Sequence, residues 1–152
     1  MNSVSRKMDS SIASAIGLLM LLTTFVFGDP IYAGTWYYFL TWLGLVGILQ
    51  IAKAPPFLTT GAALALAASF LFYWVWQASL PQPEGLLGLG HLLSLPGLGI
   101  SAVMGAIIAR RFQMTSWAAL ATGLLACCSG FAIAQLVVCQ SMLYCASLSG
   151  RL

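Results

Sequence analysis

The sequence predicts an all-α integral membrane protein, a bundle of about five transmembrane helices. Of its 152 residues, 61% are hydrophobic and 6% are charged, whereas about a quarter of the residues in a soluble domain carry a charge. The apolar residues also gather in runs close to the roughly 20 residues that cross a hydrocarbon core of about 30 Å. We therefore treat residues 1–152 as a single transmembrane helical domain.

Proline, glycine and charged residues separate five apolar runs. The first run ends at Gly28-Asp29-Pro30 and the second at Lys53-Ala54-Pro55-Pro56, because proline cannot continue a helix. Arg110-Arg111 separates the last two runs. The predicted spans are residues 12–28, 36–52, 57–77, 85–109 and 116–140. Four spans are the fallback if the segment 85–109, which contains Pro96, is re-entrant.

The first run has a second interpretation as a signal peptide, because Arg6 and Lys7 precede it. Its apolar part is long for a signal peptide, and Ile31-Tyr32-Ala33 is a mediocre cleavage site. We therefore expect residues 12–28 to form the first span.

Basic residues set the expected orientation. With the N-terminus in the cytoplasm, only Arg151 of the six basic residues lies outside, as the positive-inside rule requires. We therefore expect an extracytoplasmic C-terminus and a multi-pass protein of a bacterial inner membrane. Because the basic residues stand singly or in pairs, we expect no nucleic-acid partner. The expected cytoplasmic basic residues are Arg6, Lys7, Lys53, Arg110 and Arg111.

Two series of small residues, each spaced by four, flank the turn Arg110-Arg111-Phe112-Gln113. Residues four apart share one side of a helix, and small side chains let two helix backbones approach closely in lipid. The sequence therefore predicts a tightly packed hairpin of the last two spans. The predicted packing residues are Gly97, Ser101, Gly105 and Ala109 in the first series and Ala118, Thr122, Ala126, Gly130 and Ala134 in the second.

Aromatic residues begin the second predicted span and end the third, both at the expected outer interface. Aromatic belts are ordinary in membrane proteins, because amphipathic rings favour the interface. Their density here is also consistent with a docking surface for a lipid headgroup or a partner protein. The candidate partner or lipid surface consists of Trp36, Tyr37, Tyr73, Trp74 and Trp76.

Asp29, Glu84 and His91 form the candidate polar site of the outer face. Glu84 precedes His91 by seven residues, so a continuous helix places both on one face about two turns apart. Such a pair would serve as an acid and base or as a pH-sensitive contact. We favour the simpler interpretation, in which all three are interfacial or helix-end residues without chemistry.

The four cysteines lie near the C-terminus without a Cys-x-x-Cys pair or a nearby histidine, so we expect no metal and no cofactor. Cys139 and Cys145 stand about 9 Å apart along a continuous helix. This exceeds the usual Cα separation of a disulfide, so a bridge requires the helix to unwind near Ser141. We expect Cys127 and Cys128 to be small packing residues.

Three functions remain open. No predicted span carries an acidic or basic residue at mid-depth, where ion-coupled transporters keep them. We expect a protein without a catalytic site that binds another membrane protein or itself in the bilayer, as an accessory subunit or an immunity-type protein against a membrane-active toxin. One alternative is a small uncoupled channel or transporter, a homo-oligomer lined by Gln50, Gln135 and several threonines. The other is an outer-face membrane enzyme or thiol-redox protein.

Overall fold

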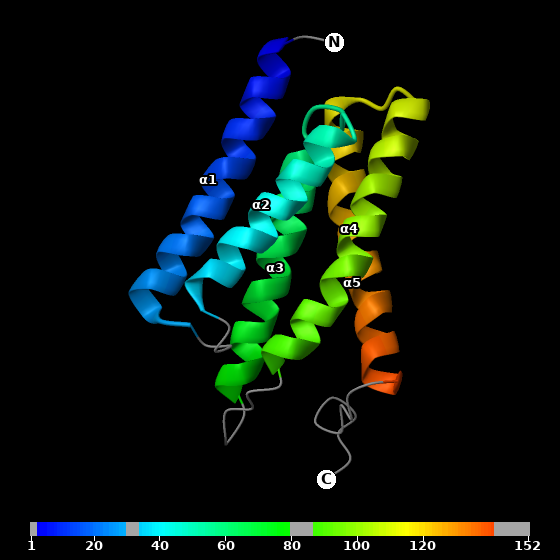
Figure 1. The fold of residues 1–152 in the computed structure, drawn as a ribbon. Helices are drawn as coiled ribbons and strands as arrows, with labels where there is room; N and C mark the ends of the chain where they lie inside the picture. The colour runs from blue at the N-terminus through cyan, green and yellow to red at the C-terminus, as the bar shows by residue number, and fades with distance from the viewer. Residues whose placement is uncertain (1–2, 30–33, 80–86, 142–152) are drawn as a thin grey trace.

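The computed structural model describes residues 3–29, 34–79 and 87–141, and this part of the chain is all-helical. The helices run alternately up and down, so α1 begins and α5 ends at opposite ends of the bundle (Figure 1). The predicted all-α class is confirmed. The helices are α1 (Ser3–Phe27), α2 (Thr35–Ile51), α3 (Leu58–Ser79), α4 (Leu87–Arg111) and α5 (Ser116–Ser141).

Four helices in the described ranges, α1, α3, α4 and α5, have the length and apolar composition to cross a membrane. Helix α2 has 17 residues and is about 26 Å long, somewhat less than a hydrocarbon core of about 30 Å. The chain is therefore a membrane protein by these criteria, and the fifth span stays a prediction. The alternative prediction of four spans assumed that the segment 85–109 is re-entrant. Instead, α4 is one helix from Leu87 to Arg111 with Pro96 inside it.

Helix α3 lies at the centre of the bundle and contacts each of the other four helices (Figure 1). Within the described residues, α1 contacts α2 and α3, and α5 contacts α3 and α4. One helix can hold four neighbours because most of its buried positions are small. These positions include Thr59, Thr60, Gly61, Ala62, Ala63, Ala65 and Ser69.

The backbones of α3 and α5 meet at two glycines. A Cβ added at Gly61 would collide with the carbonyl oxygen of Leu120, and one at Gly123 would collide with that of Leu58. Lipid tails are as apolar as leucine, so helices in a bilayer gain stability from such close packing rather than from hydrophobic burial. The two glycines therefore set the distance between α3 and α5.

The two predicted small-residue series lie between α4 and α5, with one exception. A Cβ at Gly97 would meet the Gly130 carbonyl and the Ala134 Cβ, and a Cβ at Gly105 would lie 3.3 Å from the Ala126 Cβ. Other members of the two series line the same contact or are buried beside it: Ser101 approaches Gly130, Thr122 approaches Gly105, and Ala109 is buried. Ala118 is exposed and lies outside the contact.

A third small-residue series, which we did not identify from the sequence, runs along α5. Ala119, Gly123 and Cys127 are spaced by four and are all buried. Gly123 places this series against α3, while the Ala126 and Gly130 series contacts α4. Helix α5 therefore uses two adjacent faces for two different neighbours.

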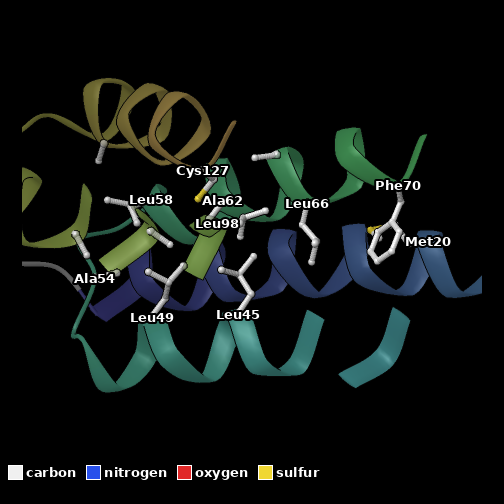
Figure 2. Packing of buried hydrophobic residues seen from close by; sticks show 14 of the residues in the cluster. Met20, Leu45, Leu49, Ala54, Leu58, Ala62, Leu66, Phe70, Leu98 and Cys127 are labelled. Carbon is white, nitrogen blue, oxygen red and sulfur yellow. The ribbon is translucent and has the colours of Figure 1, made fainter. Parts of the chain in front are cut away.

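Larger apolar side chains fill the space between α2 and the central helix. Leu45 and Leu49 of α2 point toward α3, where Leu58 and Leu66 are buried (Figure 2). Leu98 of α4 and Cys127 of α5 belong to the same cluster. The core therefore joins a small-residue half on α4 and α5 to a leucine-rich half on α2.

Helix α1 is attached near its start by polar contacts. The Asp9 carboxylate accepts hydrogen bonds from the Thr60 backbone N–H at 2.8 Å and the Thr60 hydroxyl at 2.6 Å. A carboxylate at a helix N-terminus satisfies a free N–H and complements the helix dipole. The Trp42 indole donates to the Ala13 carbonyl at 3.1 Å and covers Gly17. Asp9, absent from our sequence analysis, therefore joins α1 to the start of α3.

We predict that Gly61→Ala and Gly123→Ala each lower the stability of the bundle. The new methyl group would force the two backbones apart, at a cost of about 1–3 kcal/mol for overpacking. Thermal melting in detergent measures the effect. The control is Gly47→Ala, because no atom lies within 4 Å of a Cβ at Gly47. This control should melt at or above the wild-type temperature, since alanine favours a helix over glycine by about 1 kcal/mol. Equal melting of all three variants would contradict the α3–α5 contact.

Candidate functional site

His91 lies inside the bundle, near the start of α4, and is fully buried. The Ser69 hydroxyl donates to the Leu66 carbonyl at 2.7 Å, so it accepts at 3.0 Å from the Nε2–H of His91. The Tyr37 hydroxyl then donates to the free Nδ1 at 2.6 Å. The hydrogen-bond pattern assigns one neutral tautomer with both ring nitrogens occupied. His91 therefore joins α2, α3 and α4 inside the bundle.

Aromatic rings enclose the histidine. Phe70 stacks on the imidazole with ring centres 4.4 Å apart, and Tyr73 meets it edge-on at 4.8 Å. The ring centre of Phe131 on α5 lies 5.1 Å from that of His91. These contacts leave the imidazole shielded from solvent, so its structural role in this part of the bundle is to hold helices together.

Gln135 is a second polar junction. Its Oε1 accepts from the Tyr73 hydroxyl at 2.7 Å and from the Ser94 hydroxyl at 2.5 Å, and its Nε2 contacts Cys139 Sγ at 3.4 Å. The amide thereby links α3, α4 and α5. A buried amide with these partners stabilises a helix junction, since an unpaired polar group in an apolar interior is costly.

The three predicted outer-face residues do not form one site. Asp29 accepts hydrogen bonds from the Tyr38 hydroxyl at 2.6 Å and from the Gly34 backbone N–H. Its role is therefore to hold the start of α2, whereas His91 bonds to Tyr37 and Ser69. Glu84 lies outside the described residues.

The predicted aromatic surface is also divided by the structure. Trp36 is 76% exposed, whereas Tyr73 is buried inside the bundle. Tyr37, Trp74 and Trp76 are half-buried. The Trp74 indole donates to the Tyr38 hydroxyl at 3.2 Å, so part of this aromatic group packs inward and holds α2 against α3.

The polar residues considered for a channel do not share one path. Gln50 is exposed on α2, and Gln135 lies at the α3, α4 and α5 junction. Thr23 and Thr24 donate to carbonyls of their own helix. Thr60 binds Asp9 at the end of the bundle. Gln50 therefore faces outward, and the other residues make local hydrogen bonds at different places.

The cysteines differ in environment. Cys127 is buried and Cys128 is exposed, and both are free thiols. Cys139 is disulfide-bonded, and α5 ends at Ser141, where we expected the helix to unwind for a bridge. Cys145 lies outside the described residues. Within the described ranges, no group of three or more His, Cys, Asp or Glu residues is arranged to hold a metal ion.

An apolar groove lies between α2 and α4, beside the His91 junction. Its volume is about 620 Å³, within the range of sites that hold small ligands. Leu66 of α3 lies among its lining residues. The Tyr37–His91 bond ties α2 to α4 within about one turn of the end of the groove. The groove is lined by Leu40, Thr41, Gly44, Leu45, Ile48, Leu66, Leu92, Leu95, Pro96, Leu98, Gly99, Ile100, Val103 and Met104.

Two glycines in the groove face open space. A Cβ at Gly44 or at Gly99 would have no neighbour within 4 Å. By contrast, Gly61, Gly97 and Gly123 each touch a neighbouring helix. The groove therefore offers two small positions of the type that this bundle uses elsewhere for helix contacts.

Comparison with known proteins gives no family for this chain, because no family model, no curated protein and no solved structure matches it. No function is therefore carried over, and the candidate site depends on geometry.

The groove could not be predicted from the sequence, because Gly44 and Gly99 lie on two helices that a third helix separates in the chain. Gln77, buried near the end of α3 without a hydrogen-bond partner among the described residues, was also missed.

We predict that Tyr37 and His91 are energetically coupled. In a double-mutant cycle of Tyr37→Phe and His91→Leu, each single change leaves a buried polar atom unpaired, at a cost of about 1–3 kcal/mol. The double variant should therefore lose less stability than the sum, with a coupling of about 0.5–3 kcal/mol. Detergent unfolding measures all four proteins. A parallel cycle of Trp36→Phe with His91→Leu should be additive, because Trp36 is exposed; additivity in both cycles would refute the bond.

Proposed function

We propose that this protein is a non-catalytic binding protein of a membrane and that it holds another membrane protein at the α2–α4 groove. The observation that carries the proposal is the open apolar groove with two unpartnered glycines, Gly44 and Gly99. Small residues mark helix contacts in lipid. Side chains of a partner's transmembrane helix, rather than the whole helix, fill a volume of about 620 Å³.

The chain's own packing supports this proposal. Gly61, Gly97, Gly123 and Gly130 are each in close contact with a neighbouring helix. Gly44 and Gly99 are of the same type and lie on apolar helices, but no other described helix occupies their contact positions. In the proposed complex, a helix of a second chain contacts Gly44 and Gly99. In this role the protein is an accessory subunit of a membrane complex or an immunity-type protein that blocks a membrane-active toxin.

The proposed setting is a bacterial inner membrane with the start of α1 in the cytoplasm. The alternating helices gather the described basic residues at one end of the bundle, as the positive-inside rule favours for a cytoplasmic face (Figure 1). The disulfide of Cys139 lies toward the opposite end and is compatible with an oxidising compartment there. The basic residues at the cytoplasmic end are Arg6, Lys7, Lys53, Arg110 and Arg111.

We predict that Gly99→Leu and Gly44→Leu abolish partner binding and leave the fold intact. The leucine would occupy the groove, and no atom of another described helix lies within 4 Å of its Cβ. A photo-crosslinking residue at Ile100, in the groove and 68% exposed, should capture a second membrane protein in cells. Native mass spectrometry of membranes in mild detergent then identifies the complex and its loss in the variants.

Matched controls separate the groove from general effects. Gly47→Leu places the same side chain on α2 in open space, but Gly47 does not line the groove, so binding should persist. A crosslinker at Leu136, which is 62% exposed on α5, should capture no partner. If Ile100 crosslinks only to lipid, or if Gly47→Leu and Gly99→Leu act alike, the groove is not the binding site.

We predict no solute or ion flux through liposomes that contain only this protein. The polar side chains Gln50, Gln135 and Thr60 lie at separate places and make local bonds or face outward, so they line no shared path in one chain. Flux assays with monovalent ions and small neutral solutes provide the measurement. Protein-dependent flux that Gln135→Leu reduces would replace the binding proposal with a homo-oligomeric channel.

A further inference from the structure

The outward side of α1 carries a polar stripe at the basic end of the bundle. Ser11 and Ser14 on this side are exposed. Thr23 and Thr24, farther along α1, donate to carbonyls of their own helix. Ser11 and Ser14 have no hydrogen-bond partner among the described residues, so their hydroxyls can serve a ligand. A shallow hollow of about 680 Å³ follows the stripe and is lined by Lys7, Ser10, Ser11, Ser14, Ala15 and Leu18.

The depth of the stripe follows from Asp9, whose buried side chain lies on the inner side of α1. Asp9 binds Thr60, the third residue of α3, so this level is the end of the bundle. Along the helix axis, Lys7 lies about 3 Å beyond Asp9 and Ser14 about 7 Å closer to the membrane centre. The headgroup layer on each side of a bilayer is about 5–7 Å thick. The stripe therefore spans the headgroup layer and the border of the hydrocarbon.

The order of side chains along the stripe matches a phospholipid better than a partner helix. From the start of α1, the stripe begins with the Lys7 ammonium, continues with the Ser11 and Ser14 hydroxyls, and ends in two leucines. These leucines, Leu18 and Leu22, are 58% and 51% exposed. Ser11 and Ala15 are spaced by four, as small residues are in helix contacts, but the exposed Lys7 before them and the exposed Leu18 and Leu22 after them interrupt such a contact. A phospholipid has the same order as the stripe, with a charged phosphate, polar glycerol esters and apolar chains.

We propose that this side of α1 binds the headgroup of an anionic phospholipid. The Lys7 ammonium pairs with the lipid phosphate, and the Ser11 and Ser14 hydroxyls donate to phosphate and ester oxygens. The acyl chains lie along Leu18 and Leu22. Arg6, which precedes Lys7, is also exposed. Its positive charge adds to the attraction of anionic lipids at this end of the bundle. This site is separate from the α2–α4 groove and does not depend on its role.

The test compares phosphatidylglycerol with phosphatidylcholine on the full chain. Titration of either lipid into delipidated protein in detergent, followed by native mass spectrometry, gives the apparent affinity. We expect tighter binding of phosphatidylglycerol to the wild type, and a decrease of about fivefold or more in the Lys7→Gln, Ser11→Ala, Ser14→Ala variant, since one basic residue near an anionic surface contributes about that factor. Serine-to-alanine changes favour the helix, so the variant should fold.

The control variant is Arg110→Gln, Arg111→Gln, which removes charge at the same end of the bundle on exposed residues of α4. It should keep most of its phosphatidylglycerol affinity. An equal loss in both variants would reduce the effect to general surface charge and overturn the site. Equal binding of the two lipids by the wild type would overturn it as well. A photo-crosslinker at Ser11 that captures a protein instead of phosphatidylglycerol would make this side of α1 a protein interface.

Discussion

The close contact between the backbones of α3 and α5 is the constraint on which the rest of the bundle depends. Gly61 and Gly123 let these helices approach so closely that a Cβ at either position would collide with a carbonyl oxygen of the other helix. In lipid, such close packing replaces the hydrophobic effect as the source of helix association. Once α5 is fixed on α3, its adjacent face with Ala126 and Gly130 receives α4. The remaining faces of α3 then take α1 and α2, so one slender central helix organises the whole chain.

Buried hydrogen bonds add specificity to this packing. His91 joins α2, α3 and α4 through Tyr37 and Ser69, while Gln135 joins α3, α4 and α5 through Tyr73 and Ser94. In an apolar interior each of these groups needs its partner, so a rotated or shifted helix would leave several unpaired. Small residues thus bring the helices together, and the polar junctions select one register among the many that small residues alone allow.

Within the described residues, two surfaces of the bundle are left without contacts inside the chain and are available to other molecules. Helix α2 lies against α3 and is tied to α4 by Tyr37 and His91. Beyond this bond an apolar groove lies between α2 and α4, which run in the same direction (Figure 1). Helix α1 is attached on its inner side by Asp9 and Trp42, so its serine-bearing side faces outward. The proposed protein and lipid sites therefore lie where the bundle itself makes no contact.

The sequence by itself determines the all-α membrane class and the approximate helices, because apolar runs, prolines and basic turns act locally. It also indicates the small residues of α4 and α5, since spacing by four fixes a shared helix side whatever the neighbour. Only the tertiary structure decides that α3 is central, that His91 is buried, that Asp9 reaches Thr60, and that Gly44 and Gly99 remain open. A helix period says which residues share a side, but which neighbour meets that side depends on the packing of all five helices together.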